Sequence, residues 1–147
     1  MSVKKFKFRL EKLLKIKKQE EKQLQGEFFN LKNELYEIER KIEKKKKEID
    51  NSFLLLKKEK RSGVDFIEKW QRYISLLKSE KRKLENQKNQ KNTEVQEKMN
   101  ELLEKIKERK SVEILREKKF QAYLKELNKE EQNFIDEINT SRYKRGD

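Results

Sequence analysis

The chain has 147 residues, 47% of them charged and 32% hydrophobic, and its 41 Lys and Arg against 28 Asp and Glu give a formal net charge of +13. This composition is too polar for a compact globule with a large apolar core. Cysteine and histidine are both absent and no glycine-rich phosphate loop occurs, so we expect a protein that is not an enzyme and that binds neither metal nor cofactor.

The first predicted element is a long helix over residues about 5–61. Its apolar residues recur at alternating spacings of four and three, the pattern of a coiled-coil seam. The clearest stretch consists of Leu24, Phe28, Leu31, Leu35, Ile38 and Ile42. Gly26 lies inside this helix and costs it about 1 kcal/mol relative to Ala, which is too little to interrupt so long a pattern.

A turn is predicted at residues 62–65, where Ser62 and Gly63 interrupt the helical pattern. Gly63 is placed to end the first helix in a left-handed conformation. Asp65, with Glu68 three residues later, is placed to cap the next helix. The chain is therefore expected to reverse at this point and to form an antiparallel hairpin.

The second predicted helix covers residues about 66–142 and contains neither Gly nor Pro. Its apolar residues follow two heptad frames, and residues 85–94 between them contain no apolar residue. The change of frame predicts a stutter or a locally loosened helix pair in this stretch. Part of the first helix's stripe would face these polar residues, so either the register shifts or something else covers the stripe. The many Glu and Lys residues at a spacing of four, such as Glu94 with Lys98, are typical of a solvated helix surface.

Pairing the helices about the turn leaves the second helix roughly 20 residues longer, which is about 30 Å at the rise of an α-helix. An apolar stripe lies on this overhang and would be exposed in a monomer: Phe120, Tyr123, Leu124, Leu127, Phe134 and Ile138. Such a stripe predicts a docking surface, although a self-dimer or a bent first helix could also cover it. The predicted fold is an all-α, long antiparallel two-helix coiled-coil hairpin, a single domain over residues 1–147.

Two lysine-rich clusters, at residues 44–47 and 57–61, leave nucleic-acid binding open as an alternative, because phosphate contact alone gives sequence-independent affinity. Most aromatic residues lie on or beside the helical seam, where packing explains them, so no specific nucleic acid is expected as a partner. A self-assembling structural rod is a further alternative. The longest apolar run, residues 53–56, is far shorter than a membrane span, and a cytoplasmic protein is expected.

Both ends of the chain resemble the flagellar FliJ family. The N-terminal resemblance covers residues 8–17, which read FRLEKLLKIK. The C-terminal resemblance covers residues 117–119, 124–127, 131–132, 136–138 and 142–143. The resemblance implies a stalk-like coupling and scaffold subunit of the flagellar type III export apparatus, needed for motility and peripherally associated with the membrane through that apparatus. It implies three partners: the hexameric export ATPase, the export gate protein and export chaperones.

The resemblance also implies which residues contact these partners. After the turn, an aromatic and apolar cluster is similar to the region of the family that contacts the export gate: Trp70, Tyr73, Ile74 and Leu77. Trp and Tyr are also the side chains most enriched at binding hot spots. The paired ends of the chain are implied in contact with the ATPase ring, through Phe8, Arg9, Leu13, Phe120, Leu124, Leu127 and Phe134.

Overall fold

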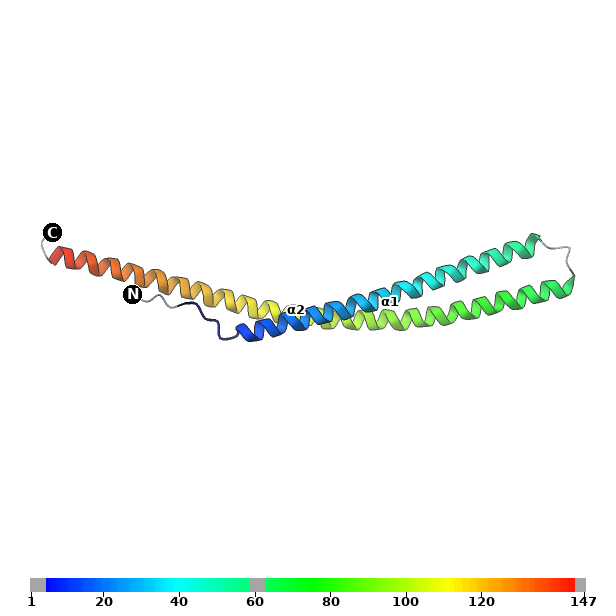
Figure 1. Cartoon of the computed structure of the whole chain (residues 1–147), viewed down its shortest axis with the longest axis horizontal. Helices are drawn as coiled ribbons and strands as arrows, with labels where there is room; N and C mark the ends of the chain where they lie inside the picture. The colour runs from blue at the N-terminus through cyan, green and yellow to red at the C-terminus, as the bar shows by residue number, and fades with distance from the viewer. Residues whose placement is uncertain (1–4, 59–62, 145–147) are drawn as a thin grey trace. The chain divides into compact units, whose positions relative to one another are not determined.

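The computed structural model describes residues 5–58 and 63–144 of the chain. These residues form two helices, α1 (Glu11–Lys58) and the longer α2 (Val64–Lys144), which pack against each other as an antiparallel hairpin (Figure 1). The predicted all-α hairpin with a longer second helix is confirmed. The hairpin divides into two compact units, residues 23–102 and residues 1–22 with 103–147. The assignment of all 147 residues to one domain stays a prediction.

The predicted start of the first helix at about Lys5 is wrong, because α1 begins at Glu11. Residues 5–8 have no regular structure and residues 9–10 form a turn. The first helical hydrogen bond runs from the amide of Leu14 to the carbonyl of Leu10, at 2.9 Å. Lys5 and Arg9 carry positive charges that the positive end of the helix dipole repels, whereas Glu11 is favoured in the first turn. The predicted end at about Arg61 lies outside the described residues.

The start of α2 also differs from the prediction. The helix begins at Val64, two residues before the predicted start, and ends at Lys144 rather than at residue 142. Gly63 does not adopt the left-handed conformation that was predicted for it. Its carbonyl accepts hydrogen bonds from the amides of Phe66 (3.0 Å) and Ile67 (3.4 Å), so Gly63 is the N-cap of α2 and Asp65 lies in the first turn. Ser62 lies outside the described residues.

In residues 23–102 the core is a single seam between the helices. Its buried apolar residues are Ile42 and Ile49 on α1 and Ile74, Leu77 and Leu102 on α2. Ser52 is also buried, and its hydroxyl donates a hydrogen bond of 2.7 Å to the carbonyl of Glu48. A seam this narrow leaves few residues to stabilise the hairpin, so each buried side chain has a large share of the hydrophobic stabilisation.

Ion pairs between the helices show that the register of residues 23–102 is constant. Lys45 pairs with Glu80 at 2.6 Å, Lys91 with Glu34 at 2.7 Å and Lys98 with Glu27 at 2.9 Å. In all three pairs the two residue numbers add up to 125. The Lys91 pair lies inside the polar stretch 85–94, so the predicted stutter there is wrong. Half-buried polar side chains occupy the seam in this stretch, where their aliphatic stems can cover apolar surface.

Gly26 offers a simple test of helix stability in α1. A Cβ at this position would have no atom within 4 Å, and the residue is exposed. We expect Gly26→Ala to raise the free energy of unfolding by about 0.5–1 kcal/mol, because Ala loses less backbone entropy in a helix. Urea unfolding followed by far-UV circular dichroism measures this. Gly63→Ala is the control: Ala is a poor N-cap, so it should give no gain, and an equal gain from both variants would contradict the explanation.

Candidate functional site

The N-terminal segment, residues 5–10, packs on α2 through an aromatic cluster formed by Phe6, Phe120 and Tyr123. The ring of Phe6 lies 5.1 Å from that of Phe120 at an interplanar angle of 70°, and 5.6 Å from that of Tyr123. The rings of Phe120 and Tyr123 stack with their centroids 6.3 Å apart. Edge-to-face and offset arrangements of this kind are favourable for aromatic pairs. The cluster therefore holds the N-terminal segment against the first part of the predicted overhang.

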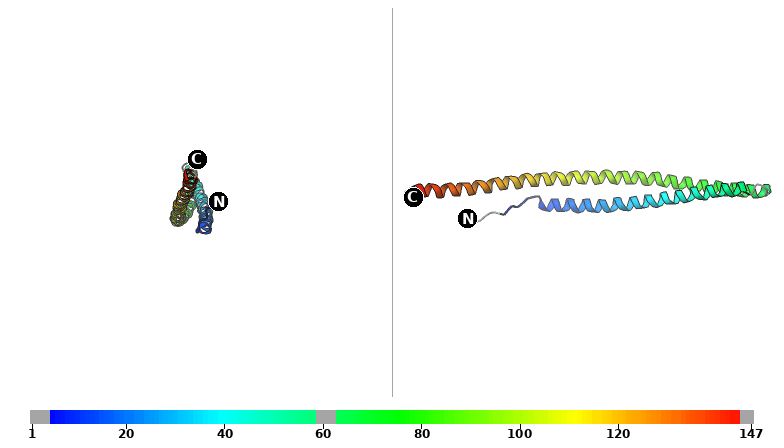
Figure 2. Two further views of the ribbon diagram at one scale, coloured as in Figure 1. Left: turned by 90° about the vertical axis from the view of Figure 1, so that its left-hand side faces the viewer. Right: turned by 90° about the horizontal axis from the view of Figure 1, so that it is seen from above.

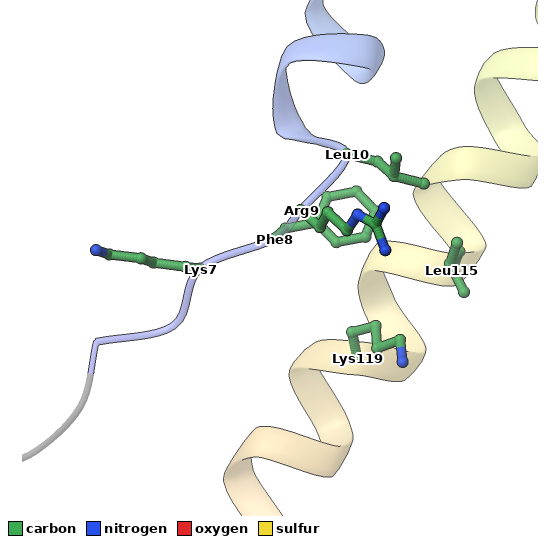
Figure 3. Close-up of a pocket in the computed structure, with 6 residues that line it drawn as sticks. All are labelled: Lys7, Phe8, Arg9, Leu10, Leu115 and Lys119. Carbon is green, nitrogen blue, oxygen red and sulfur yellow. The ribbon is translucent and has the colours of Figure 1, made fainter.

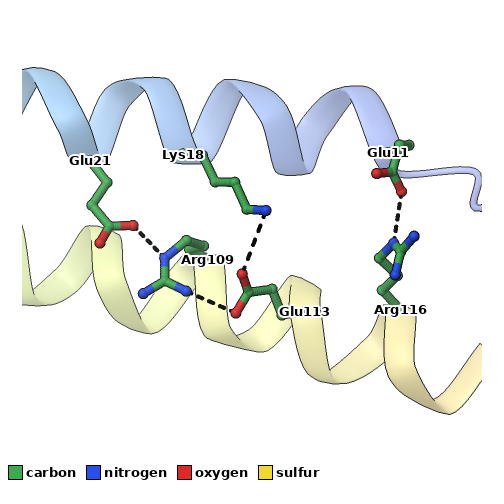
Figure 4. A network of polar contacts seen from close by, with 6 residues as sticks. All are labelled: Glu11, Lys18, Glu21, Arg109, Glu113 and Arg116. Atoms are coloured by element: carbon green, nitrogen blue, oxygen red, sulfur yellow. Dashed lines mark hydrogen bonds and ion pairs between the residues drawn. The ribbon is translucent and has the colours of Figure 1, made fainter.

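Arg116 on α2 contacts the junction between the N-terminal segment and the start of α1. Its guanidinium carbon lies 5.6 Å from the ring centroid of Phe6, and its Nε donates a hydrogen bond of 2.9 Å to Glu11 Oε2 at the start of α1 (Figure 4). One side chain thus contacts both the non-helical segment and the first residue of the helix. The cation–π contact and the ion pair together fix the point where the N-terminal segment enters α1.

Beside this junction lies a groove of about 420 Å³ lined by Lys7, Phe8, Arg9, Leu10, Leu115 and Lys119. Phe8 and Arg9 lie toward α2, next to Leu115 and Lys119, whereas Lys7 points away (Figure 3). Half of the lining residues are cationic and half are apolar. The groove is therefore suited to an apolar side chain that stands next to a carboxylate.

The structure brings together some of the residues predicted to contact the ATPase ring. Phe8 and Arg9 line the groove, and Phe120 belongs to the aromatic cluster. Of the others, Leu13 is 36% exposed, Leu124 and Leu127 are half-buried, and Phe134 is 46% exposed farther along α2. In Figures 1 and 2 the last turns of α2 run past the start of α1. Their contact with an ATPase stays a prediction.

Sequence reasoning missed six residues of this junction: Phe6, Lys7, Leu10, Leu115, Arg116 and Lys119. A signal for the first three was present, because residues 5–10 alternate strictly between basic and apolar side chains. A period of two is typical of an extended segment and not of a helix. The three residues on α2 have no such signal, since their role depends on where the extended segment lies.

A second candidate surface follows the turn and belongs to residues 23–102. The ring of Trp70 lies 6.0 Å from that of Phe66 and 5.6 Å from that of Tyr73, both in edge-to-face arrangements. A cavity of about 260 Å³ lies between Lys69, Trp70 and Tyr73. Tyr73 is 45% exposed, whereas Ile74 and Leu77 are 5% and 3% exposed. Of the four residues predicted at the export gate, Tyr73 is exposed and Trp70 is half-buried, whereas Ile74 and Leu77 are buried in the seam. Their contact with the export gate stays a prediction.

An ion-pair network lies near the start of α1, in the unit formed by residues 1–22 and 103–147. Arg109 donates hydrogen bonds to Glu21 and, at 2.8 Å, to Glu113 (Figure 4). These bonds hold the pKa of Arg109 above its usual range. Glu21 is only 9% exposed, so this pair is the most buried charge contact among the described residues that pair across the hairpin. It fixes the register of α1 against α2 next to the groove.

The acid stability of the hairpin should depend on two glutamates. The hydrogen bond from Lys98, then its charge, lowers the pKa of Glu27, and the hydrogen bond from Lys17 lowers the pKa of Glu108. A lowered carboxyl pKa stabilises the fold above the ordinary Glu pKa of about 4.5, and this contribution is lost as the pH falls through the lower folded value. We expect thermal unfolding midpoints to fall steadily on acidification below that pH.

The variant Glu27→Gln provides the control for this pH dependence. It removes one of the two shifted carboxyl groups, so its midpoint should fall less steeply with acid than that of the unmodified chain. The raised pKa of Lys98 affects stability only at high pH, because its contribution is lost when the pH rises through the pKa of this lysine in the folded state. Parallel acid profiles for both chains would show that the Glu27–Lys98 pair does not contribute.

No helix in residues 5–58 and 63–144 is long and apolar enough to cross a membrane. Within the same ranges, no group of three or more acidic side chains is arranged so that it could hold a metal ion.

Comparison with known proteins assigns the chain to one family. Residues 6–147 match the family model described as flagellar FliJ protein, so the match includes the N-terminal segment, both helices and the surface after the turn. No curated protein and no solved structure matches the chain. Because the model covers nearly the whole sequence, the chain belongs to the FliJ family, whose members are components of the flagellar export apparatus.

Proposed function

We propose that this chain is a stalk-like coupling and scaffold subunit that binds the hexameric export ATPase and the export gate and assists in the handling of export chaperones. It performs no catalysis of its own. The observation that carries the proposal is the junction at the N-terminal segment, where a cationic and apolar groove adjoins the apolar stripe of α2. The membrane association of the subunit is peripheral and occurs through the export apparatus.

The groove and the stripe offer two kinds of interaction to an ATPase ring. The basic groove residues and the net charge of +13 attract acidic surfaces over long range and raise the rate of encounter. The half-buried Leu124 and Leu127, next to the aromatic cluster, supply the apolar contact that holds the complex. In the unit of residues 23–102, Trp70 and Tyr73 form a separate aromatic surface for the export gate.

Nucleic-acid binding loses support from the structure. A groove of about 400 Å³ is lined by Lys41, Lys44, Lys45, Glu48, Glu80, Lys83 and Leu84. Lys45 is paired with both Glu48 and Glu80, which lowers the positive potential of the groove. No aromatic ring is among the lining residues, so in this groove bases have nothing on which to stack.

The test is co-elution of the chain with the export ATPase of the same organism at about 0.15 M and 0.5 M salt, since screening weakens charge contacts far more than apolar ones. We expect the complex to survive the higher salt and to be lost with Leu124→Glu, which places a charge in the apolar stripe. Ala122→Glu is the matched control, because Ala122 is exposed on the same helical turn.

A nucleic-acid duplex added as a competitor separates the alternatives. If the ATPase does not co-elute but the duplex is captured in a salt-sensitive manner, the chain is a polyanion-binding coiled coil. If Ala122→Glu abolishes the complex as fully as Leu124→Glu, the stripe of α2 is not the contact.

A further inference from the structure

The last turns of α2 present an apolar face that no described part of the chain covers. Every residue from 128 to 143 is exposed, including Phe134 (46%), Ile135 (48%) and Ile138 (38%). The a/d pattern of the stripe continues through this segment at Glu131, Phe134, Ile138 and Ser141. An α-helical surface with a continuous seam and three exposed large apolar side chains is suited to pairing with another helix.

The charges of this segment differ from those of the chain as a whole. Residues 128–143 contain four acidic and two basic side chains, in a protein with a net charge of +13. An anionic membrane or a nucleic acid would therefore be repelled here. The acidic residues Glu130 and Glu131 come before the apolar group, and the basic Arg142 comes after it.

This order makes the segment complementary to itself when it is reversed. If a second copy runs antiparallel, Phe134 lies opposite Ile138 of the other copy, and the same contact occurs a second time by symmetry. The acidic end of each copy then lies near the basic end of the other. A parallel pair would instead place Glu131 opposite Glu131 and Arg142 near Arg142, which is unfavourable.

We propose that, in the free protein, residues 128–143 pair with the same segment of a second copy as a short antiparallel coiled coil centred between Phe134 and Ile138. Ile135, on one edge of the seam, meets Ile135 of the other copy and widens the apolar contact. On the other edge Glu137 meets Glu137, which keeps the dimer weak. Because the interface contains only a few layers of seam side chains, we expect a dissociation constant of about 10–100 µM, as for other small interfaces.

Sedimentation velocity of the full chain, from about 5 to 200 µM around the expected constant, tests the surface. We expect a monomer that becomes a dimer over this range. Phe134→Asp should weaken the dimer at least tenfold, Glu137→Gln should strengthen it, and Asn133→Asp, which adds the same charge off the seam, should leave it unchanged. The proposal would be overturned if the chain stays a monomer at every concentration, or if the Phe134→Asp variant dimerises as strongly as the unmodified chain.

Cross-linking tests the orientation, and the absence of native cysteine makes it unambiguous. In an antiparallel pair residue 131 of one copy lies opposite residue 141 of the other. A short bismaleimide should therefore link Glu131→Cys chains to Ser141→Cys chains in a mixture, but neither variant to itself. Self-linking of either variant would show a parallel pair, and no linking in the mixture would show that another surface makes the dimer. Neither experiment contains the ATPase, so both are independent of the proposed function.

Discussion

Leu77→Ala should lower the free energy of unfolding by about 2–4 kcal/mol, the usual cost of truncating a buried leucine. Leu77 is 3% exposed, and its seam in residues 23–102 contains only four other buried apolar residues. The two-helix hairpin has no further layer that could relax into the space left by the side chain. Urea unfolding with far-UV circular dichroism would measure the loss as a shift of the midpoint.

Leu76→Ala is the matched control, because it makes the same chemical change one residue away. Leu76 is 55% exposed, and the effect of its truncation should stay within about 0.5 kcal/mol. Similar losses from both variants would show that burial in the seam does not determine the cost of the truncation, since Ala has at least the helix propensity of Leu. Trp70 and Tyr73 stand next to Leu77 on α2, so the seam also supports the surface proposed for the export gate.

The fold was predictable because it depends on periodicity. The spacing of four and three in residues 24–42 requires a partner helix, and Gly63 marks the reversal. The register was less predictable, because apolar spacing alone suggested a stutter in the polar stretch 85–94. Lys91 and Lys98 stand seven residues apart and face Glu34 and Glu27, also seven apart. These charges keep the register where apolar residues are missing. In the sequence alone, the spacing of Glu94 and Lys98 indicates only a local pair within one helix.

The candidate site was predicted only in part, for a related reason. The family resemblance implies that Phe8 and Arg9 contact the ATPase, whereas the heptad pattern extends the first helix through both residues. The alternation of residues 5–10 contradicts that extension, but six residues are a weak signal beside a long helix. The position of Phe6 on Phe120 depends on a tertiary contact between residues more than a hundred positions apart. No local pattern encodes such a contact.

Arg109→Met should lower the free energy of unfolding by about 1–3 kcal/mol, because it leaves the carboxylate of Glu21 without a partner in a nearly buried position. Met keeps most of the volume and helix propensity of Arg, so the loss reflects the charge. Glu21→Gln combined with Arg109→Met removes the unpaired charge and should regain most of the loss. Lys18→Met is the control, since Lys18 is 56% exposed and 3.9 Å from Glu113, and it should have little effect.

The double variant tests the mechanism directly. If the loss in Arg109→Met comes from the unpaired carboxylate of Glu21, the uncharged amide of Glu21→Gln restores most of the stability. An equal loss in Arg109→Met and in the double variant would mean that Arg109 stabilises the hairpin by packing alone. Because this pair fixes α1 against α2 beside the groove, a charge effect would also connect the stability of the hairpin end to the surface proposed for the ATPase.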